Sequence, residues 1–291
     1  MKTVLLPIWL LLSAAAPAAP VLDGPLEKGL SHVRFSGWTG PQIPVWVYLP
    51  WRSEAATAPI LFVMHGNSRD PARYVAEWDD LAEQHGLVII APEFSREAFP
   101  GSLRYNLGYL FDEGSGAERR AEATWSFSAL EPLFDAVVAA LGSNQTHYTL
   151  YGHSAGSQFV HRYHFLKPDA RVRRVLAANA GWYTLADLNE PWPYGLGGAG
   201  VSRDQLKKAL AAEVVVLLGT ADNDPQHKSL RRTPEALAQG AHRFARGQHF
   251  FATARDRATA LGVPFGWKLV EVPDVAHSNR GMAAAAARRV R

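Results

Sequence analysis

The chain has 291 residues, of which 47% are hydrophobic, 11% aromatic and 20% charged. This composition excludes a disordered, collagen-like or coiled-coil protein, and the length allows one large α/β domain or two small ones. The absence of cysteine excludes disulfides, thiolate metal sites and a cysteine nucleophile.

The formal net charge is +3, and the excess sits at the two ends of the chain. Four basic residues lie there: Lys2, Arg288, Arg289 and Arg291. Removing these four from the 30 leaves 26 basic side chains against 27 acidic ones. The body of the chain is therefore close to neutral, and we expect no nucleic-acid partner.

Residues 1–18 have the pattern of a secretory signal peptide. A basic start is followed by the apolar run 4–12 and then by small residues around Ala16-Pro17-Ala18. Cleavage after Ala18 would leave 19–291 as the mature chain, in the medium or the periplasm. A membrane anchor is the alternative, but prolines interrupt the apolar stretch, so we expect no stable anchor.

From residue 32 onward, short apolar strands alternate with helices. The segments 32–35 and 45–49 predict an N-terminal hairpin, because a turn rich in Gly and Pro separates them. Further strands are predicted at 60–64, 87–91, 148–151, 174–178, 214–218 and 267–272. Helices are predicted at 72–85, 118–141, 158–165, 233–261 with interruptions at Gly240 and Gly247, and 279–291.

Most of these strands are apolar at every position, which is typical of a parallel sheet buried on both faces. We therefore predict an α/β fold with a mainly parallel central sheet flanked by helices. No repeat or low-complexity linker divides the mature chain. The candidate site residues named below are spread from 66 to 277, so we expect a single domain over 19–291.

The segment 181–200 departs from the alternation of strands and helices. It groups bulky aromatic side chains with Pro and Gly: Trp182, Tyr183, Trp192 and Tyr194. We interpret it as a cap or lid over the carboxyl edge of the sheet, where ligand sites of α/β proteins lie. Two roles stay open for the aromatic residues: an apolar wall of a substrate pocket, or packing that fastens the cap. Residues 105–109 (YNLGY) likewise either border the pocket or pack as an ordinary loop.

The motif Gly152-His153-Ser154-Ala155-Gly156 lies between a predicted strand and a predicted helix. A G-x-S-x-G sequence in this context predicts a sharp turn that lifts the serine hydroxyl above the sheet. Glycine on both sides relieves the crowding of such a turn. Ser154 is therefore the candidate nucleophile.

A serine hydroxyl needs a base, and the base needs an anion that orients it. Among the six histidines after Ser154, His277 is the best placed, in a loop that follows the last predicted strand. Two carboxylates follow the strand 214–218. Asp222 comes first, and Asp224 is the rival, although the proline after it favours a turn role.

Acyl transfer also needs two donors aimed at the developing oxyanion. The amide of Ala155, directly after the nucleophile, is one candidate. The second is expected in the loop after strand 60–64, from Gly66 or Asn67.

These residues, from about Pro59 to His277, resemble the α/β-hydrolase superfamily, whose triad follows the chain order serine, acid, histidine. Within it, the chain is similar to secreted polyhydroxybutyrate-depolymerase-like and feruloyl-esterase-like serine hydrolases. The resemblance implies an exported serine esterase without a cofactor. Members of these groups often carry disulfides or a separate polymer-binding domain. This chain has no cysteine and no room for such a domain, so the resemblance favours a serine hydrolase more than a polyester depolymerase.

We therefore expect a secreted serine hydrolase that cleaves a small or polymeric carboxylic ester through an acyl-enzyme. A peptidase or amidase of the same fold is the alternative, and a binding protein with a vestigial site is a third interpretation. No cofactor or metal is expected. His161 and His164 lie on one helix face, but no third ligand completes a metal site. The acyl and alcohol groups and the oligomeric state stay open.

Overall fold

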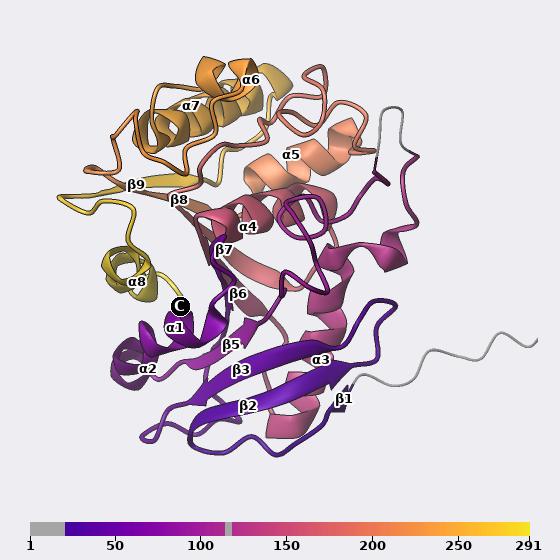
Figure 1. Cartoon of the computed structure of the whole chain (residues 1–291), viewed down its shortest axis with the longest axis vertical. Helices are drawn as coiled ribbons and strands as arrows, with labels where there is room; N and C mark the ends of the chain where they lie inside the picture. The colour runs from indigo at the N-terminus through magenta and orange to yellow at the C-terminus, as the bar shows by residue number, and fades with distance from the viewer. Residues whose placement is uncertain (1–20, 114–117) are drawn as a thin grey trace, which may run out of the picture.

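The structure, a computed structural model, describes residues 21–113 and 118–291. The predicted signal peptide lies outside the described residues. The centre of the molecule is a nine-stranded sheet in the order β1-β2-β3-β5-β4-β6-β7-β8-β9 (Figure 1). The strands are β1 (Val21–Leu22), β2 (Gly29–Ser36), β3 (Ile43–Leu49), β4 (Ile60–Met64), β5 (Val88–Pro92), β6 (Tyr148–His153), β7 (Val172–Ala178), β8 (Val214–Gly219) and β9 (Lys268–Val272).

The sheet is antiparallel at its N-terminal edge and parallel elsewhere. β2 and β3 form the predicted hairpin, and β3 pairs antiparallel with β5. From β5 to β9 every neighbouring pair is parallel. The predicted α/β fold with a mainly parallel sheet is confirmed. The carboxyl ends of the parallel strands meet at one edge, where side chains from distant parts of the sequence can converge.

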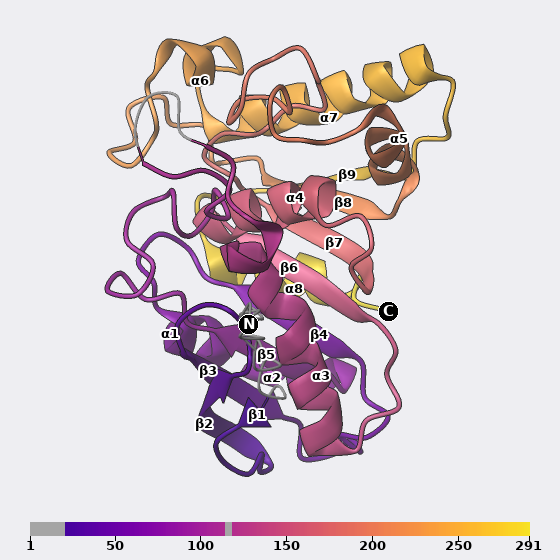
Figure 2. The ribbon, with the colours of Figure 1, turned by 90° about the vertical axis from the view of Figure 1, so that its right-hand side faces the viewer.

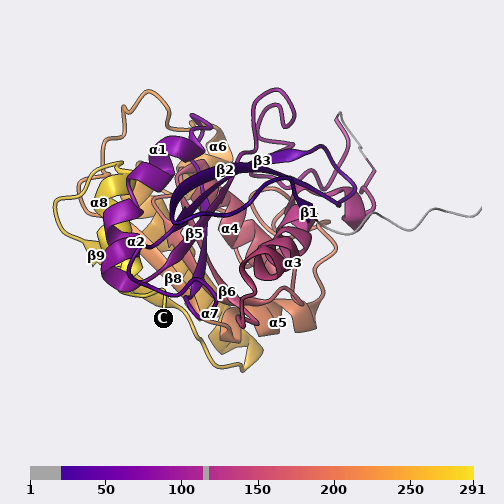
Figure 3. The same cartoon turned by 90° about the horizontal axis from the view of Figure 1, so that it is seen from below.

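Helices cover both faces of the sheet. Residues of α3, α4, α5 and α7 pack in one hydrophobic cluster, and residues of α1, α2 and α8 pack in the other. Figure 2 shows α3 and α4 in front of the strands, and Figure 3 shows α1, α2 and α8 on the opposite side from α3. The helices are α1 (Pro71–Ala76), α2 (Asp79–His85), α3 (Leu130–Leu141), α4 (Ala155–Leu166), α5 (Arg203–Ala211), α6 (Pro234–Ala238), α7 (Arg243–Leu261) and α8 (Asn279–Ala287).

The alternation of side chains along β4 explains the two clusters. Leu61 and Val63 face the cluster of α1, α2 and α8, whereas Phe62 and Met64 face the other. Because both faces are covered by helices, all five residues of β4 are buried. The apolar run in the sequence therefore reports two-sided burial.

Three predicted helices differ from the structure. The helix predicted at 72–85 is two helices, and the turn between them places the buried Trp78 ring 4.8 Å from the ring of Tyr151. The helix predicted at 118–141 begins only at Leu130, after two short 3₁₀ turns, Glu122–Thr124 and Ser126–Ala129.

The interruption at Gly240 is confirmed, since α6 ends at Ala238 and α7 begins at Arg243. The interruption at Gly247 is wrong, because α7 runs through it. A Cβ atom at this position would lie 2.2 Å from Leu218 of β8, so Gly247 allows close helix–sheet packing.

Helix α5 was not predicted, although its start carries a clear local signal. The Ser202 hydroxyl accepts a bond from the Gln205 amide, and the Gln205 side chain accepts one from the Ser202 amide. This reciprocal capping starts a helix with the spacing S-x-x-Q.

The segment 181–200 runs without regular structure from the carboxyl end of β7 towards α5. Internal backbone hydrogen bonds hold it, among them Leu185 N to the Tyr194 carbonyl at 2.7 Å. Within the described ranges, no helix is long and apolar enough to cross a membrane.

Candidate active site

Ser154 occupies the sharp turn between β6 and α4 that the sequence predicts. Its backbone is strained, with φ 59° and ψ −117°. The flanking glycines are required by space. A Cβ atom on Gly152 would lie 2.2 Å from the Gly156 carbonyl oxygen, and one on Gly156 would lie 1.9 Å from the Met64 carbonyl oxygen. The turn therefore tolerates no side chain at either position and presents Ser154 at the carboxyl edge.

His277 lies between Ser154 and Asp222. Its Nε2 atom is 3.0 Å from Ser154 Oγ, and its Nδ1 atom is 2.7 Å from Asp222 Oδ2. His277 comes from the loop after β9 and Asp222 from the loop after β8. The three residues, far apart in the sequence, form one hydrogen-bonded chain with the geometry of a nucleophile, a base and an orienting carboxylate.

Asp224 takes no part in the hydrogen bonds that link Ser154, His277 and Asp222. Its Oδ1 atom accepts a hydrogen bond from the Gln226 amide at 2.8 Å, and the residue is exposed. This is the turn role that the following proline favours. Of the two candidate carboxylates, only Asp222 contacts His277.

Arg243 holds the second oxygen of Asp222, and sequence reasoning missed it. Its Nη1 atom donates to Asp222 Oδ1 at 3.1 Å, and both side chains are only 3% exposed. Its Nη2 atom donates to Ser229 Oγ at 2.9 Å and lies 3.2 Å from His227 Nδ1. Arg243 therefore ties the carboxylate to the loop that follows it. No sequence motif predicts that an arginine 21 positions after Asp222 pairs with it.

The candidate oxyanion donors lie around Ser154. Ala155 is the first residue of α4, so its amide has no acceptor within the helix. A Cβ atom on Gly66 would lie 3.5 Å from the Cβ of Ser154, which places the loop after β4 against the nucleophile. Asn67, the next residue, lines the same cavity as Ser154 and Ala155.

A buried histidine holds this loop in place. The amide of Phe94 donates to His65 Nε2 at 3.1 Å, so the proton of the neutral ring sits on Nδ1, which is 3.1 Å from the Gly66 carbonyl oxygen. Burial lowers the pKa of His65 to about 3. It also lowers the pKa values of His153, His161 and His164 below their ordinary value.

We expect these buried histidines to make the fold less stable in acid. In the unfolded chain these histidines have the ordinary pKa of about 6.5, and in the folded chain their pKa is lower. Between the two pKa values the unfolded chain therefore binds protons at these rings and the folded chain does not. We therefore expect the free energy of unfolding to fall as the pH drops below about 6.5. In His65→Gln the fall between about pH 7 and about pH 4.5 should be smaller by about 2 kcal/mol.

Urea denaturation at the two pH values measures this difference. Thr124→Ala, a change at a half-buried position without a titratable group, should show the same fall as the wild type. An equal fall in His65→Gln and the wild type would contradict the assignment to His65.

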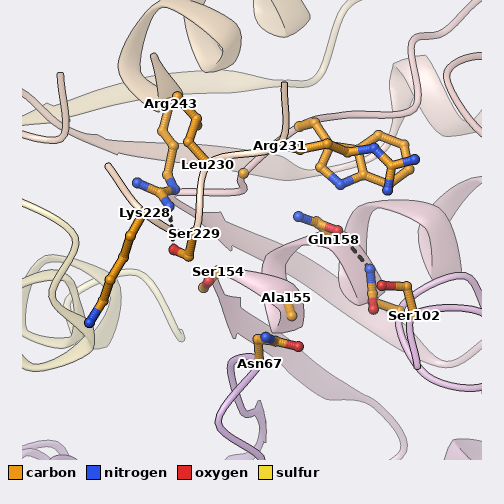
Figure 4. A pocket seen from close by; sticks show the side chains of 13 residues that line it. Asn67, Ser102, Ser154, Ala155, Gln158, Lys228, Ser229, Leu230, Arg231 and Arg243 are labelled. Atoms are coloured by element: carbon orange, nitrogen blue, oxygen red, sulfur yellow. Dashed lines mark hydrogen bonds between the residues drawn. The ribbon is translucent and has the colours of Figure 1, made fainter. Parts of the chain in front are cut away.

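A cavity of about 280 Å³ opens beside Ser154. Figure 4 shows Lys228, Ser229 and Arg243 on one side of Ser154 and Arg231 on the other. Among the described residues, the lining contains three cationic side chains and no carboxylate, and one of the cations, Arg243, is paired with Asp222. The lining residues are Asn67, Ser102, Asn106, Ser154, Ala155, Gln158, Gly181, Trp182, Lys228, Ser229, Leu230, Arg231 and Arg243.

Only one of the four aromatic cap residues lines this cavity. Trp182 is part of its wall, and the Tyr194 ring packs behind it at 4.7 Å between centroids. Tyr183 is buried against Phe250, with ring centroids 4.4 Å apart, and Trp192 packs against the main core. The interpretation as a pocket wall thus holds for Trp182 alone, and the other three fasten the cap.

Residues 105–109 serve both of the roles left open for them. Asn106 lines the cavity and donates to Gln158 Oε1 at 2.6 Å, whereas Tyr105 is buried and donates to the His65 carbonyl at 2.7 Å.

His161 and His164 bond to the backbone. His161 Nδ1 lies 2.8 Å from the Ser157 carbonyl, and its Nε2 accepts from the Thr184 amide at 3.0 Å. His164 Nε2 lies 2.8 Å from the Ala209 carbonyl. In the part of the chain that the structure describes, no cluster of three or more potential metal ligands occurs.

The strand order, the sharp turn at Ser154 and the convergence at the carboxyl edge define an α/β-hydrolase. Two solved structures are similar over most of the chain. Poly(aspartic acid) hydrolase-1 from Sphingomonas sp. KT-1 is 45% identical, with a TM-score of 0.88 over 91% of this chain and 99% of that one. The poly(3-hydroxybutyrate) depolymerase LpqC from Bordetella parapertussis is 33% identical, with a TM-score of 0.83 over 90% and 89%.

The chain therefore belongs to the α/β-hydrolase superfamily, among the polyhydroxybutyrate-depolymerase-like hydrolases, and is an ester or amide hydrolase of this fold. A more distant structure, the fluorophosphonate-binding serine hydrolase FphF from Staphylococcus aureus, is 17% identical with a TM-score of 0.57 and shares the fold. It covers 92% of this chain and 98% of its own. Neither a scan against models of protein families nor a search of curated proteins gave a match.

Proposed function

We propose that this hydrolase works through an acyl-enzyme on Ser154, with His277 as the base and Asp222 as the orienting acid. The hydrogen-bonded chain of the three side chains, at 3.0 and 2.7 Å, supports this assignment. A hydroxyl is a poor nucleophile until a base takes its proton, and His277 Nε2 is at the right distance to do so.

In the first half of the reaction, Ser154 Oγ attacks the substrate carbonyl carbon and its proton passes to His277 Nε2. Asp222 stabilises the imidazolium that forms. The amides of Ala155 and of Gly66 or Asn67 donate to the carbonyl oxygen as it becomes negative. The bond to the leaving group then breaks, and the leaving amine or alcohol takes the proton from His277.

In the second half, water replaces the leaving group. His277 takes a proton from water, and the hydroxide attacks the acyl carbon. The bond to Ser154 Oγ breaks, the serine regains its proton from His277, and a carboxylic acid is released.

We further propose that the substrate is a chain that carries carboxylates, with poly(aspartic acid) as the model compound. The single observation that carries this proposal is the charge of the cavity: among the described residues no carboxylate lines it, and two of its three cations, Lys228 and Arg231, have no carboxylate partner, whereas Arg243 is paired with Asp222. Carboxylates on the substrate would compensate the lining charges. The name of the relative at 45% identity, a poly(aspartic acid) hydrolase, agrees with this charge and favours amide over ester cleavage.

The test compares poly(aspartic acid) with poly(3-hydroxybutyrate), which is neutral, and with p-nitrophenyl acetate. We expect poly(aspartic acid) to be cleaved fastest per enzyme. We also expect kcat/KM on it to fall steeply between about 0.01 M and about 0.5 M salt, because salt screens charge attraction. Turnover of p-nitrophenyl acetate should change little over the same range.

A neutral polyester is the second candidate substrate, since a poly(3-hydroxybutyrate) depolymerase is 33% identical. Faster cleavage of poly(3-hydroxybutyrate), without a salt effect, would favour it and contradict the proposed acidic substrate. If the protein bound either polymer but turned over no substrate, the result would favour a binding protein with a vestigial site.

We also propose that the protein is exported and that residues 1–18 are removed. The support is the pattern of the segment itself, a basic start, an apolar run and small residues at the expected cleavage point. Mass spectrometry of the protein recovered outside the cytoplasm should give a chain that begins at Ala19.

A further inference from the structure

The ring of Trp182, in the wall of the cavity, carries two guanidinium groups. The Cζ atom of Arg162 lies 4.2 Å from the ring centroid, and that of Arg231 lies 4.7 Å from it. Each contact is attractive because the face of an indole is electron-rich. The two cations repel each other, however, so one ring brings together two like charges that need an anion.

Arg162 is the buried member of the pair. Its side chain is fully buried in α4, and it forms no ion pair with a carboxylate among the described residues. Its Nε donates to Thr184 Oγ1 at 2.7 Å and its Nη1 to the Asn106 carbonyl at 3.0 Å. Its Nη2 is buried and has no partner in the described part of the chain. A buried cation without a counter-ion is costly, which points to a charge supplied from outside.

Arg231 is the open member of the pair. It lines the cavity and is exposed there. Among the described residues, its only side-chain hydrogen bond is the one that Nε donates to the Tyr194 hydroxyl at 2.7 Å, and Tyr194 in turn packs on Trp182. Within residues 21–113 and 118–291, no carboxylate pairs with the terminal nitrogens of Arg231. The hydrogen bond from Nε thus fixes the planar guanidinium in the cavity lining. Its two terminal nitrogens can there bind a carboxylate with two parallel hydrogen bonds.

The surroundings of Trp182 in the cavity are polar but uncharged. The Asn106 side chain donates to Gln158 there at 2.6 Å, and this bond is the dashed line that ends on Gln158 in Figure 4. Their amides can donate to an anion or accept from a donor, but they add no negative charge. Among the described residues, no carboxylate pairs with Arg162 or Arg231, so the site carries a net positive charge.

We propose that Arg231 and Trp182, with Arg162 buried against the same ring, form a carboxylate-binding subsite that selects the substrate. The subsite binds a side-chain carboxylate of the substrate, away from the bond that is cleaved. This deepens the proposed function and rests on it for the identity of the substrate. In this arrangement the substrate carboxylate pairs directly with Arg231, and its charge compensates the buried Arg162 at longer range across the Trp182 ring.

The experiment replaces the open cation and compares it with its neighbour. Arg231→Gln removes the charge, and Arg232→Gln is the matched control. Arg232 is exposed, bonds only to the Pro225 carbonyl and the Gln226 side chain, and does not line the cavity. Both variants are assayed on poly(aspartic acid) and on p-nitrophenyl acetate. Poly(aspartic acid) is also tested as an inhibitor of p-nitrophenyl acetate turnover.

Arg231→Gln should lower the ratio of kcat/KM on poly(aspartic acid) to kcat/KM on p-nitrophenyl acetate about tenfold, mostly through KM, because a charged hydrogen bond is lost. Arg231→Lys should fall between wild type and Arg231→Gln, since it keeps the charge and loses the fork. Arg232→Gln should keep the wild-type ratio. The urea midpoint of each variant shows whether it folds.

Failure of the subsite and failure of the proposed substrate give different results. If the wild type cleaves poly(aspartic acid) and Arg231→Gln keeps the wild-type ratio, the subsite is overturned and the proposed function stands. If the wild type does not cleave poly(aspartic acid) but is inhibited by it, and Arg231→Gln weakens the inhibition about tenfold, the proposed substrate fails and the subsite stands. If Arg232→Gln weakened the inhibition equally, the subsite would be overturned, because the loss of any positive charge on this surface would then have the same effect.

Discussion

Ser154→Ala is expected to lower kcat on every substrate by about 10⁶-fold, the scale of loss when a serine nucleophile is removed. The hydroxyl is the only atom that changes, and it is the atom that His277 Nε2 contacts at 3.0 Å. The Ser154 backbone should keep its turn, because alanine is no larger than serine. The fold should therefore survive the loss of activity.

Turnover of p-nitrophenyl acetate and labelling by a fluorophosphonate probe measure the two sides of this prediction. The wild type should be labelled and Ser154→Ala should not. Ser128→Ala is the matched control, since its hydroxyl bonds to the Glu122 carbonyl on a surface turn before α3. Equal labelling of the wild type and Ser154→Ala would contradict the assignment of Ser154 as the nucleophile.

Asp222→Asn is expected to lower kcat by about 10⁴-fold, because a neutral amide neither holds the productive tautomer of His277 nor stabilises its cation. The change should also reduce stability by about 3 kcal/mol, since it leaves the buried Arg243 without its anion. The two effects have different causes, so they are measured separately, by steady-state kinetics and by urea denaturation.

Asp224→Asn is the control for both effects. It stands two positions away and is exposed, and among the described residues its side chain bonds only to the Gln226 amide in its own turn. We expect its activity to stay within a few-fold of wild type and its stability to stay within about 0.5 kcal/mol. A larger loss of activity in Asp224→Asn than in Asp222→Asn would reverse the assignment of the acid.

The fold could be predicted to the level of its class and most of its strands. β4, β5 and β8 are apolar at every position, and a run of this kind reports burial on both faces without knowledge of the neighbours. The errors fall where packing overrides local pattern. The helix predicted at 72–85 breaks at the turn that buries Trp78, and α7 continues through Gly247, where Leu218 leaves no space for a side chain.

The candidate site could be predicted as far as its members follow strand ends. Ser154 lies in a five-residue motif, and Asp222 and His277 each come soon after a strand, so local signals suffice to find them. Arg243 and Arg231 carry no such signal. Their role depends on the distance to Asp222 and to Trp182, which is a property of the folded chain.

The sequence by itself determined the α/β class, the turn around Ser154 and a short set of candidates for the base, the acid and the oxyanion donors. Each of these features depends on the residue types at a few consecutive positions. The burial pattern of a strand and the backbone freedom of glycine in a turn can be predicted from such a short segment. It left the acid undecided between Asp222 and Asp224.

Only the tertiary structure decided which carboxylate meets His277, which aromatic residue lines the cavity, and that the cavity is cationic. The chain is nearly neutral apart from its ends, so no sum over the sequence predicts a charged pocket. Lys228, Arg231 and Arg243 line one cavity with Ser154 because the loop after β8 and the start of α7 lie beside the end of β6, and Arg243 is paired there with Asp222.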